Sequence, residues 1–215
     1  MATGLTADVL VAGAGPTGLT VALQLHDHGA GVRIVDRRPE AFRPSRAMIV
    51  QPRTLEVLRP LDVTDALLDR GDRAPQALLH LGRRQVPVSL GDLTLPDTAF
   101  PHLTLLRQMD VEEVLIEALA RRGVAVERGT ELVGMRPDPG SVLATRRSLA
   151  GTQEARFRFL AACDGQASRA RTLAGIGWHG GPYREDAVLA DLELDTELAP
   201  GVGHVVAPRG APAVP

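Results

Sequence analysis

Three glycines near the start of the chain have the spacing of a phosphate-binding turn. They form the pattern Gly-x-Gly-x-x-Gly directly after an apolar run. In such a turn the first glycine permits a tight bend, the second lets a pyrophosphate approach the backbone, and the third lets helix and strand pack closely. The N–H groups that begin the following helix then bind the phosphates. The residues expected to contact a nucleotide here are Gly13, Gly15, Pro16, Thr17 and Gly18.

An acidic residue follows this turn at the distance typical of nucleotide binding. Residues 8–12 read as a buried parallel strand, helical spacing then continues to Gly29, and residues 32–35 read as a second strand that ends in Asp36. Asp36 lies 18 residues after Gly18, where a carboxylate accepts hydrogen bonds from an adenosine ribose. The alternatives are a glycine-rich turn without a ligand and an ordinary strand-end carboxylate. The turn alone does not separate FAD from NAD.

The rest of the chain alternates helical and strand patterns. Residues 110–122 form the clearest helix, because Asp110 and Glu113 have the spacing of a capping box and an apolar stripe follows. The tail from residue 200 is proline-rich and has no periodic pattern, which indicates a loop. The other expected elements are helices at 53–59, 63–70 and 168–174, a hairpin of strands at 76–81 and 85–90, and strands at 124–127, 131–136, 142–147, 155–162 and 188–194.

Composition argues against several classes of function. The formal net charge is −2 over 215 residues, so no strong overall field attracts nucleic acid or an anionic membrane. The single cysteine, Cys163, cannot form an internal disulfide or a thiolate cluster, and the six histidines lack a zinc-helix spacing, so we expect no metal site. The apolar stretch 9–25 is broken by glycine and proline and follows no basic residue, unlike a signal peptide or a membrane span. We therefore expect a cytoplasmic protein.

Three further stretches point to one family. They are Arg46–Leu58, with the sequence RAMIVQPRTLEVL; Leu106–Asp110, with the sequence LRQMD; and Phe159–Arg171, with the sequence FLAACDGQASRAR. Together with the glycine turn, and in this order, they resemble the FAD-dependent aromatic hydroxylases. These are the group A flavoprotein monooxygenases of the para-hydroxybenzoate hydroxylase type, and the sequence is most similar to their polyketide hydroxylases.

The resemblance implies roles for five further residues. Arg46 would bind the FAD pyrophosphate, for which a guanidinium is suited, and Arg37 would stack on adenine. Gln108 would offer its amide to the ribityl hydroxyls of the flavin. Asp164 and Gly165 would shape a turn near the flavin and nicotinamide phosphates. The alternatives are solvated surface arginines, an unremarkable glutamine, and a helix N-cap at Asp164 or Ser168, which is compatible with the binding role.

The same resemblance implies an α/β fold: a Rossmann-like FAD-binding domain with a parallel sheet, plus part of a β-rich substrate domain. We expect the FAD-binding domain to comprise residues 1–72 and 101–180. Residues 73–100 and 181–215 would be segments of the substrate domain.

The implied activity is hydroxylation of a small aromatic substrate, a phenol and in some relatives a polyketide. NADPH would bind transiently and reduce FAD, and O₂ would react to give a flavin hydroperoxide. This chemistry belongs to the cofactor, so we assign no catalytic residue. The second half of such enzymes has no counterpart after Leu194, so a partner chain or a C-terminal half would complete the site. The alternatives are a non-catalytic nucleotide-binding remnant or partner subunit and, less in keeping with the motifs, an NAD(P)-dependent dehydrogenase.

Overall fold

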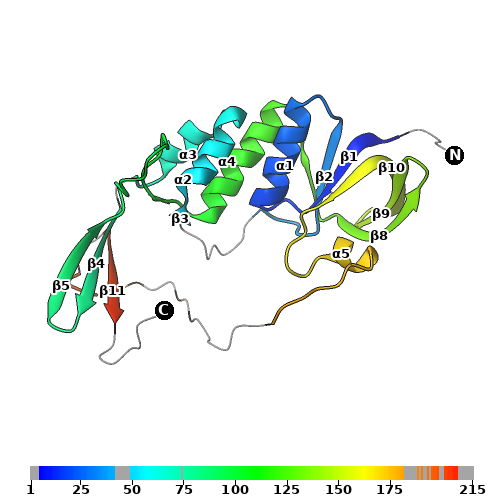
Figure 1. Cartoon of the computed structure of the whole chain (residues 1–215). Coiled ribbons are helices and arrows are strands. Elements are labelled where there is room, and N and C mark those ends of the chain that lie inside the picture. The colour runs from blue at the N-terminus through cyan, green and yellow to red at the C-terminus, as the bar shows by residue number, and fades with distance from the viewer. Residues whose placement is uncertain are drawn as a thin grey trace. The chain divides into compact units, whose positions relative to one another are not determined.

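A computed structural model describes residues 5–41, 49–73, 75–181, 188, 190, 193, 195–198 and 201–207. The chain divides into two compact units (Figure 1). The first comprises residues 1–45, 61–63 and 108–186, and the second comprises residues 46–60, 64–107 and 187–215. This division differs from the expected domain boundaries because it assigns residues 46–60, 64–72 and 101–107 to the second unit and residues 181–186 to the first.

A six-stranded sheet forms the centre of the first unit. Its strand order is β7-β2-β1-β10-β9-β8. The pairs β7–β2, β2–β1 and β1–β10 are parallel. The pairs β10–β9 and β9–β8 are antiparallel, so the sheet is mixed. The strands are β1 (Ala7–Ala12), β2 (Val32–Asp36), β7 (Val126–Arg128), β8 (Glu131–Asp138), β9 (Ser141–Ser148) and β10 (Gly151–Ala162).

Strand β1 is central because its residues are apolar on both faces, as a buried parallel strand requires. Leu10 and Ala12 join a buried cluster with Phe157 of β10. Val9 and Val11 alternate with them, are also buried, and therefore face the other side of the sheet. Because β1 pairs in parallel with β2 and β10, the carboxyl ends of these three strands lie together at one edge of the sheet.

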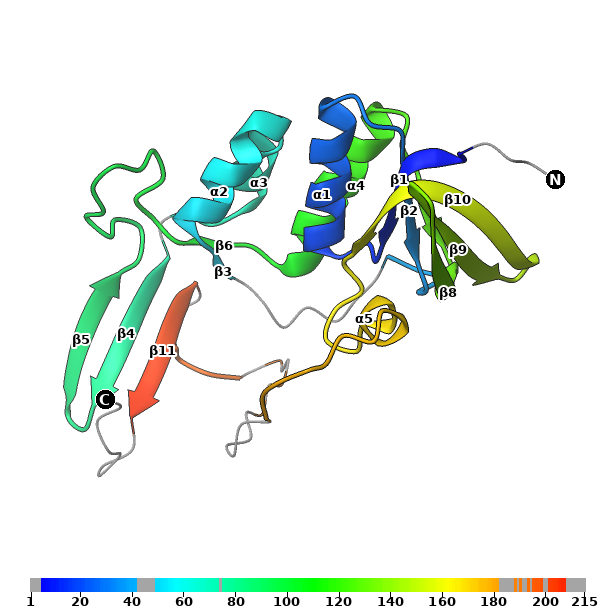
Figure 2. The same ribbon diagram turned by 45° about the vertical axis from the view of Figure 1, so that its right-hand side comes forward.

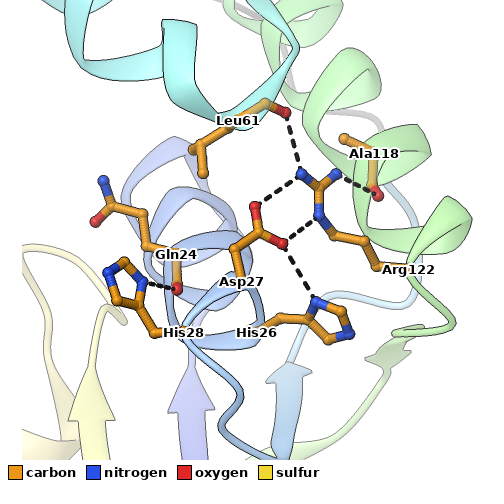
Figure 3. A network of polar contacts seen from close by, with 7 residues as sticks. All are labelled: Gln24, His26, Asp27, His28, Leu61, Ala118 and Arg122. Carbon is orange, nitrogen blue, oxygen red and sulfur yellow. Dashed lines mark hydrogen bonds and ion pairs between the residues drawn. The ribbon is translucent and has the colours of Figure 1, made fainter.

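Two long helices of the first unit pack against each other. They are α1 (Pro16–Asp27) and α4 (Gln108–Arg121), which lie side by side in both views (Figure 2). At their carboxyl ends Arg122 donates two hydrogen bonds to Asp27, from Nε at 2.6 Å and from Nη2 at 2.8 Å (Figure 3). The same guanidinium donates to the carbonyl oxygens of Ala118 and Leu61. This contact fixes the end of α1 that is remote from the glycine turn.

The second unit contains short helices and a small sheet. Helix α2 (Pro52–Leu58) is followed by the 3₁₀ turn η1 (Arg59–Leu61), whose last residue belongs to the first unit, and then by α3 (Thr64–Arg70). The sheet has the order β11-β4-β5. Its strands are β4 (Gln76–Leu81), β5 (Arg84–Ser89) and β11 (Val202–Ala207), and a separate pair is formed by β3 (Ile49–Val50) and β6 (Thr104–Leu105).

Two local expectations were wrong. Helix α4 begins at Gln108, so Asp110 and Glu113 lie inside the helix and no capping box precedes it; Asp110 instead places a carboxylate in the first turn, where the helix dipole favours it. The tail after residue 200 contains β11, which pairs in parallel with β4. That pairing is long-range, so local periodicity did not indicate it. The strand expected at 188–194 lies mostly outside the described residues, and the described ones there are not in a strand.

The last helix of the first unit is α5 (Arg169–Leu173), which contacts β8. The sheet and the helices of the first unit confirm the expected α/β class, with a sheet that is parallel only in part. Over the described ranges, no helix is both long enough and apolar enough to span a membrane.

Candidate cofactor-binding site

The first residue of the turn after β1, Gly13, has a backbone conformation that only glycine adopts readily. Gly13 has φ of +102°, and a Cβ atom there would lie 2.2 Å from the carbonyl oxygen of Cys163. A Cβ atom on Gly18 would lie 1.9 Å from the carbonyl oxygen of Gly13. Both glycines are therefore needed for the chain's own packing, between β1, α1 and the end of β10.

Gly15 differs from the other two glycines. Its φ is −82° and its ψ is −179°, an extended conformation open to any residue. A Cβ atom on Gly15 would meet no atom within 4 Å in the described part of the chain. The space in front of Gly15 is thus open, as the approach of a pyrophosphate requires.

The amino end of α1 follows at once. Gly15 is its N-cap residue and Pro16 its first residue, and no side chain in the described part of the protein caps it by a hydrogen bond. The first N–H groups of a helix have no partner within the helix, and the helix dipole makes this end partly positive. Thr17 is exposed there. This end of the 12-residue helix is suited to bind an anion.

Asp36 lies at the carboxyl end of β2, next to the glycine turn. Its side chain is 5% exposed, and its Oδ2 accepts the N–H of Ala14 at 2.8 Å. Its Oδ1 accepts the backbone N–H of Arg38 at 2.9 Å, and the Arg38 guanidinium donates to both carboxylate oxygens at 3.1 Å. Burial by itself would raise the pKa of Asp36, but the hydrogen bonds from Arg38 and Ala14 outweigh it and hold the pKa below its ordinary value.

A cavity of about 270 Å³ connects these features. Gly13, Gly15 and Asp36 line one part of it, together with Arg37 and Arg38. Arg37 is an exposed residue of this lining. The cavity lies outside the carboxyl ends of β1, β2 and β10, where ligands of open α/β sheets bind.

The turn after β10 forms the opposite wall of the cavity. Asp164 and Gly165 both line it, and Gly165 has φ of +82°. The Asp164 carboxylate turns toward the start of α5, where Oδ1 accepts the hydroxyl of Ser168 at 2.5 Å. Oδ2 accepts the N–H groups of Arg169 at 2.6 Å and Ala170 at 3.0 Å. Of the two N-cap candidates, Ser168 is the N-cap residue of α5, and its Oγ accepts the N–H of Arg171 at 3.0 Å. Asp164 accepts further N–H groups of the same helix start while it lines the cavity.

Gln108, the first residue of α4, is half-buried. Its Nε2 donates to Oε1 of Glu112 at 2.8 Å, one turn later in the helix. It is not among the residues that line the cavity. Arg46 lies outside the described residues.

Sequence reasoning missed several residues of this site. Arg38 clamps Asp36, and Thr130 and Leu132 line the cavity together with Glu131. The backbone N–H of Thr130 donates to the carbonyl oxygen of Asp36 at 2.9 Å, which fixes the start of β8 beside the end of β2. The signal that could have found Arg38 is its position two residues after an acid at a strand end. The residues from β8 gave no local signal.

Cys163 also lines the cavity. Burial, and then the negative charge of Asp164, raise the pKa of its thiol. The thiol therefore stays protonated at neutral pH and is a poor nucleophile. Among the described residues, no group of three or more histidine, cysteine, aspartate or glutamate side chains could hold a metal ion.

The glycine turn, the buried acid and the cavity at the strand ends define a dinucleotide-binding α/β protein. A family model described as FAD binding domain matches residues 6–207. The chain therefore belongs to the FAD binding domain family.

Known relatives narrow the class. The chain is 36% identical to 6-methylpretetramide 4-monooxygenase from Streptomyces rimosus over 199 residues, 92% of this chain and 35% of the relative. It is 32% identical to rifampicin monooxygenase from Streptomyces venezuelae, over 87% of this chain and 38% of the relative. The expected resemblance to FAD-dependent aromatic and polyketide hydroxylases is confirmed. The chain spans little more than a third of the length of these relatives.

Solved structures of aromatic hydroxylases share this fold. Aklavinone-11 hydroxylase in complex with FAD and aklavinone superposes with a TM-score of 0.73 at 30% identity, over 83% of this chain and 36% of that one. The p-nitrophenol 4-monooxygenase of Pseudomonas putida superposes with a TM-score of 0.75 at 26% identity, over 82% of this chain and 45% of that one.

The residues present fit the ADP half of FAD. Gly15 leaves room for the pyrophosphate, α1 offers its amino end, and Asp36 presents a carboxylate at the cavity. Arginines 37, 38 and 169 also line the cavity, so a dianionic group would meet positive charge there.

Proposed function

We propose that this chain forms the FAD-binding part of a monooxygenase that hydroxylates an aromatic substrate with NAD(P)H and O₂. The observation that carries the proposal is the open approach to Gly15 at the uncapped end of α1, inside a cavity lined by Asp36. Membership of the FAD binding domain family identifies the dinucleotide as FAD.

The ADP half would be held by three groups of contacts. The N–H groups around Gly15, Thr17 and Gly18 would bind the pyrophosphate. The Asp36 carboxylate would accept hydrogen bonds from the ribose hydroxyls, and its lowered pKa keeps it ionised for that role at neutral pH. The guanidinium of Arg37, an exposed residue that lines the cavity, would stack on adenine.

The flavin half would extend toward the residues at the ends of β10 and α4. Asp164 and Gly165 would form one wall beside the phosphates, and Gln108 would bind a ribityl hydroxyl through its amide. Arg46 would add a cation for the pyrophosphate. When bound, FAD supplies the hydride acceptance from NAD(P)H and the activation of O₂, and the protein supplies position, charge and exclusion of water.

The substrate class follows from relatives rather than from the cavity. Relatives that match this chain in sequence or structure are named for 6-methylpretetramide, rifampicin and aklavinone. We therefore propose a phenolic substrate, with polyketides as the first compounds to test. The rest of the substrate pocket would come from a C-terminal half or a partner chain.

A titration followed by absorbance and flavin fluorescence tests the proposal. Purified protein should bind FAD saturably, NADPH should bleach the bound flavin in the absence of air, and a phenol should stimulate NADPH consumption in air. The Asp27→Asn variant, which alters a contact at the far end of α1, is the matched control and should bind FAD like the unaltered protein.

Two results would contradict the proposal at different levels. Absence of saturable FAD binding would refute the cofactor assignment. Tight FAD binding without bleaching by NADPH would instead favour a nucleotide-binding subunit without turnover.

A further inference from the structure

A carboxylate is buried where the packing of α4 would be served by an apolar side chain. Glu112 is 2% exposed and lies among the buried residues Val111, Val114 and Leu115 of this helix. Burying a carboxylate is unfavourable unless charges and hydrogen bonds compensate for the lost hydration. A leucine at this position would avoid that cost, so packing does not explain the glutamate.

The two oxygens of Glu112 are used unequally. Oε1 accepts the side-chain N–H of Gln108 at 2.8 Å. Oε2 is buried and has no hydrogen-bond partner among the residues that the structure describes. Among the described residues, the hydrogen-bond partner of this carboxylate is therefore Gln108, the residue expected to bind the flavin.

Arg38 supplies the compensating charge. The negative charges of Asp36, foremost, and of Glu112 raise the pKa of Arg38 against the opposing effect of burial. Nε and Nη2 of Arg38 are bound to Asp36, whereas its buried Nη1 has no hydrogen-bond partner within the described ranges. Arg38 is thus hydrogen-bonded to Asp36 on β2 and interacts with Glu112 on α4 through its charge.

We propose that Glu112 is a positioning residue for the flavin half of FAD, and that it acts by holding the amide of Gln108. Gln108 and Glu112 are four residues apart and share one face of α4. Because Glu112 holds the Nε2 end of the amide, the Oε1 end is directed away from it as an acceptor for a ribityl hydroxyl. This inference rests on the proposed binding of FAD and extends it to a residue that does not line the cavity.

Binding of FAD and ADP by variants at residue 112 tests the inference, because ADP lacks the ribityl chain. Glu112→Leu should weaken FAD binding about fivefold, the effect of one lost hydrogen bond, and leave ADP binding within about twofold. Glu112→Gln keeps an oxygen that can accept from Gln108 and should restore FAD affinity to within about twofold of the original. Glu113→Leu, a change at an exposed neighbour on the same helix, is the matched control and should affect neither ligand.

A double-mutant cycle separates positioning from packing. If Glu112 acts through Gln108, then Glu112→Leu should have no further effect on FAD affinity in a Gln108→Ala background. Glu112→Met replaces Glu112→Leu in this scheme if the leucine variant does not fold, and the same outcomes are expected.

Three results would overturn the inference: FAD affinity unchanged in the apolar variants, equal losses for ADP and FAD, or additive effects in the cycle. If the unaltered protein binds ADP but not FAD, the proposed function fails and the inference fails with it. If the unaltered protein binds FAD and the apolar variants bind it equally well, the inference alone is wrong.

Discussion

Two neighbouring parallel strands, β1 and β10, each end in a glycine-containing turn that leads into a helix, but the two helix starts differ. At α5 the first N–H groups are satisfied by the chain itself, because Asp164 accepts two of them and Ser168 accepts the N–H of Arg171 at 3.0 Å. At α1 the cap is Gly15, which has no side chain, and within the residues that the structure describes no side-chain hydrogen bond caps this helix start.

This difference gives the two helix starts different roles: the start of α1 is available to phosphate, and the turn before α5 lines the cavity. Unsatisfied N–H groups at a helix start bind whatever acceptor is present, so the helix that the protein leaves uncapped is the one available to a ligand. The first N–H groups of α5 already donate to Asp164, so this turn contributes to the shape of the cavity and not to phosphate binding.

Gly15→Val should have the largest effect on binding. The valine side chain would fill the space in front of the α1 amino end, so FAD affinity should fall at least about 100-fold, or about 2.7 kcal/mol. The thermal midpoint should change little, because the backbone of Gly15 is extended and a Cβ atom meets no described atom within 4 Å. Calorimetric titration and thermal unfolding measure both quantities. Unchanged FAD affinity would show that the phosphates do not bind at this turn.

Gly18→Ala should instead act on stability. Its Cβ atom would lie 1.9 Å from the carbonyl oxygen of Gly13 and 3.2 Å from Cβ of Cys163, so backbone must move. Overpacking of this kind costs roughly 1–3 kcal/mol, which urea unfolding would detect. A variant as stable as the original would mean that the contact between α1 and the turn relaxes easily. The two substitutions together test whether Gly15 and Gly18 have separate roles.

The parts of this site that sequence predicted are those encoded locally. The glycine spacing and the acid at the end of β2 lie in one βαβ unit, so residue order alone places them together. Thr130 reaches the site only because β7 pairs with β2 and carries the start of β8 to Asp36. Arg38 is one of many arginines, and no periodicity marks it as the partner of Asp36. Such contacts depend on tertiary neighbours, which a single sequence does not state.

The helix α4 illustrates the same limit in a different way. Its apolar stripe predicted a packed helix, and the helix is present. The stripe did not predict that Glu112 would be buried, since an acid beside it reads as part of the solvated face. Its burial, at 2% exposed, depends on what packs around α4, which a single sequence does not state.

Asp164→Ala should have an intermediate effect on stability. It removes the acceptor for the N–H groups of Arg169 and Ala170, while the N-cap residue Ser168 remains, and loss of such hydrogen bonds costs about 1 kcal/mol. Asp164→Asn keeps one acceptor oxygen and should recover about half of this loss. Urea unfolding measures the free energies. The loss of FAD affinity in Asp164→Ala should be smaller than in Gly15→Val; an equal loss would mean that the α5 turn contacts the phosphates directly.

Asp27→Asn should have the smallest effect and no influence on binding. The hydrogen bond from Arg122 foremost lowers the pKa of Asp27, so the ion pair stabilises the fold above the ordinary carboxyl pKa and its contribution is lost as pH falls through the lower, folded-state value. Because the pair is partly exposed, the expected loss at neutral pH is only about 0.5 kcal/mol. The difference in unfolding free energy between the two proteins should therefore shrink as the pH is lowered below about 4. A difference that persists in acid would assign the effect to packing of α1 on α4. A change in FAD affinity would mean that the two ends of α1 are coupled.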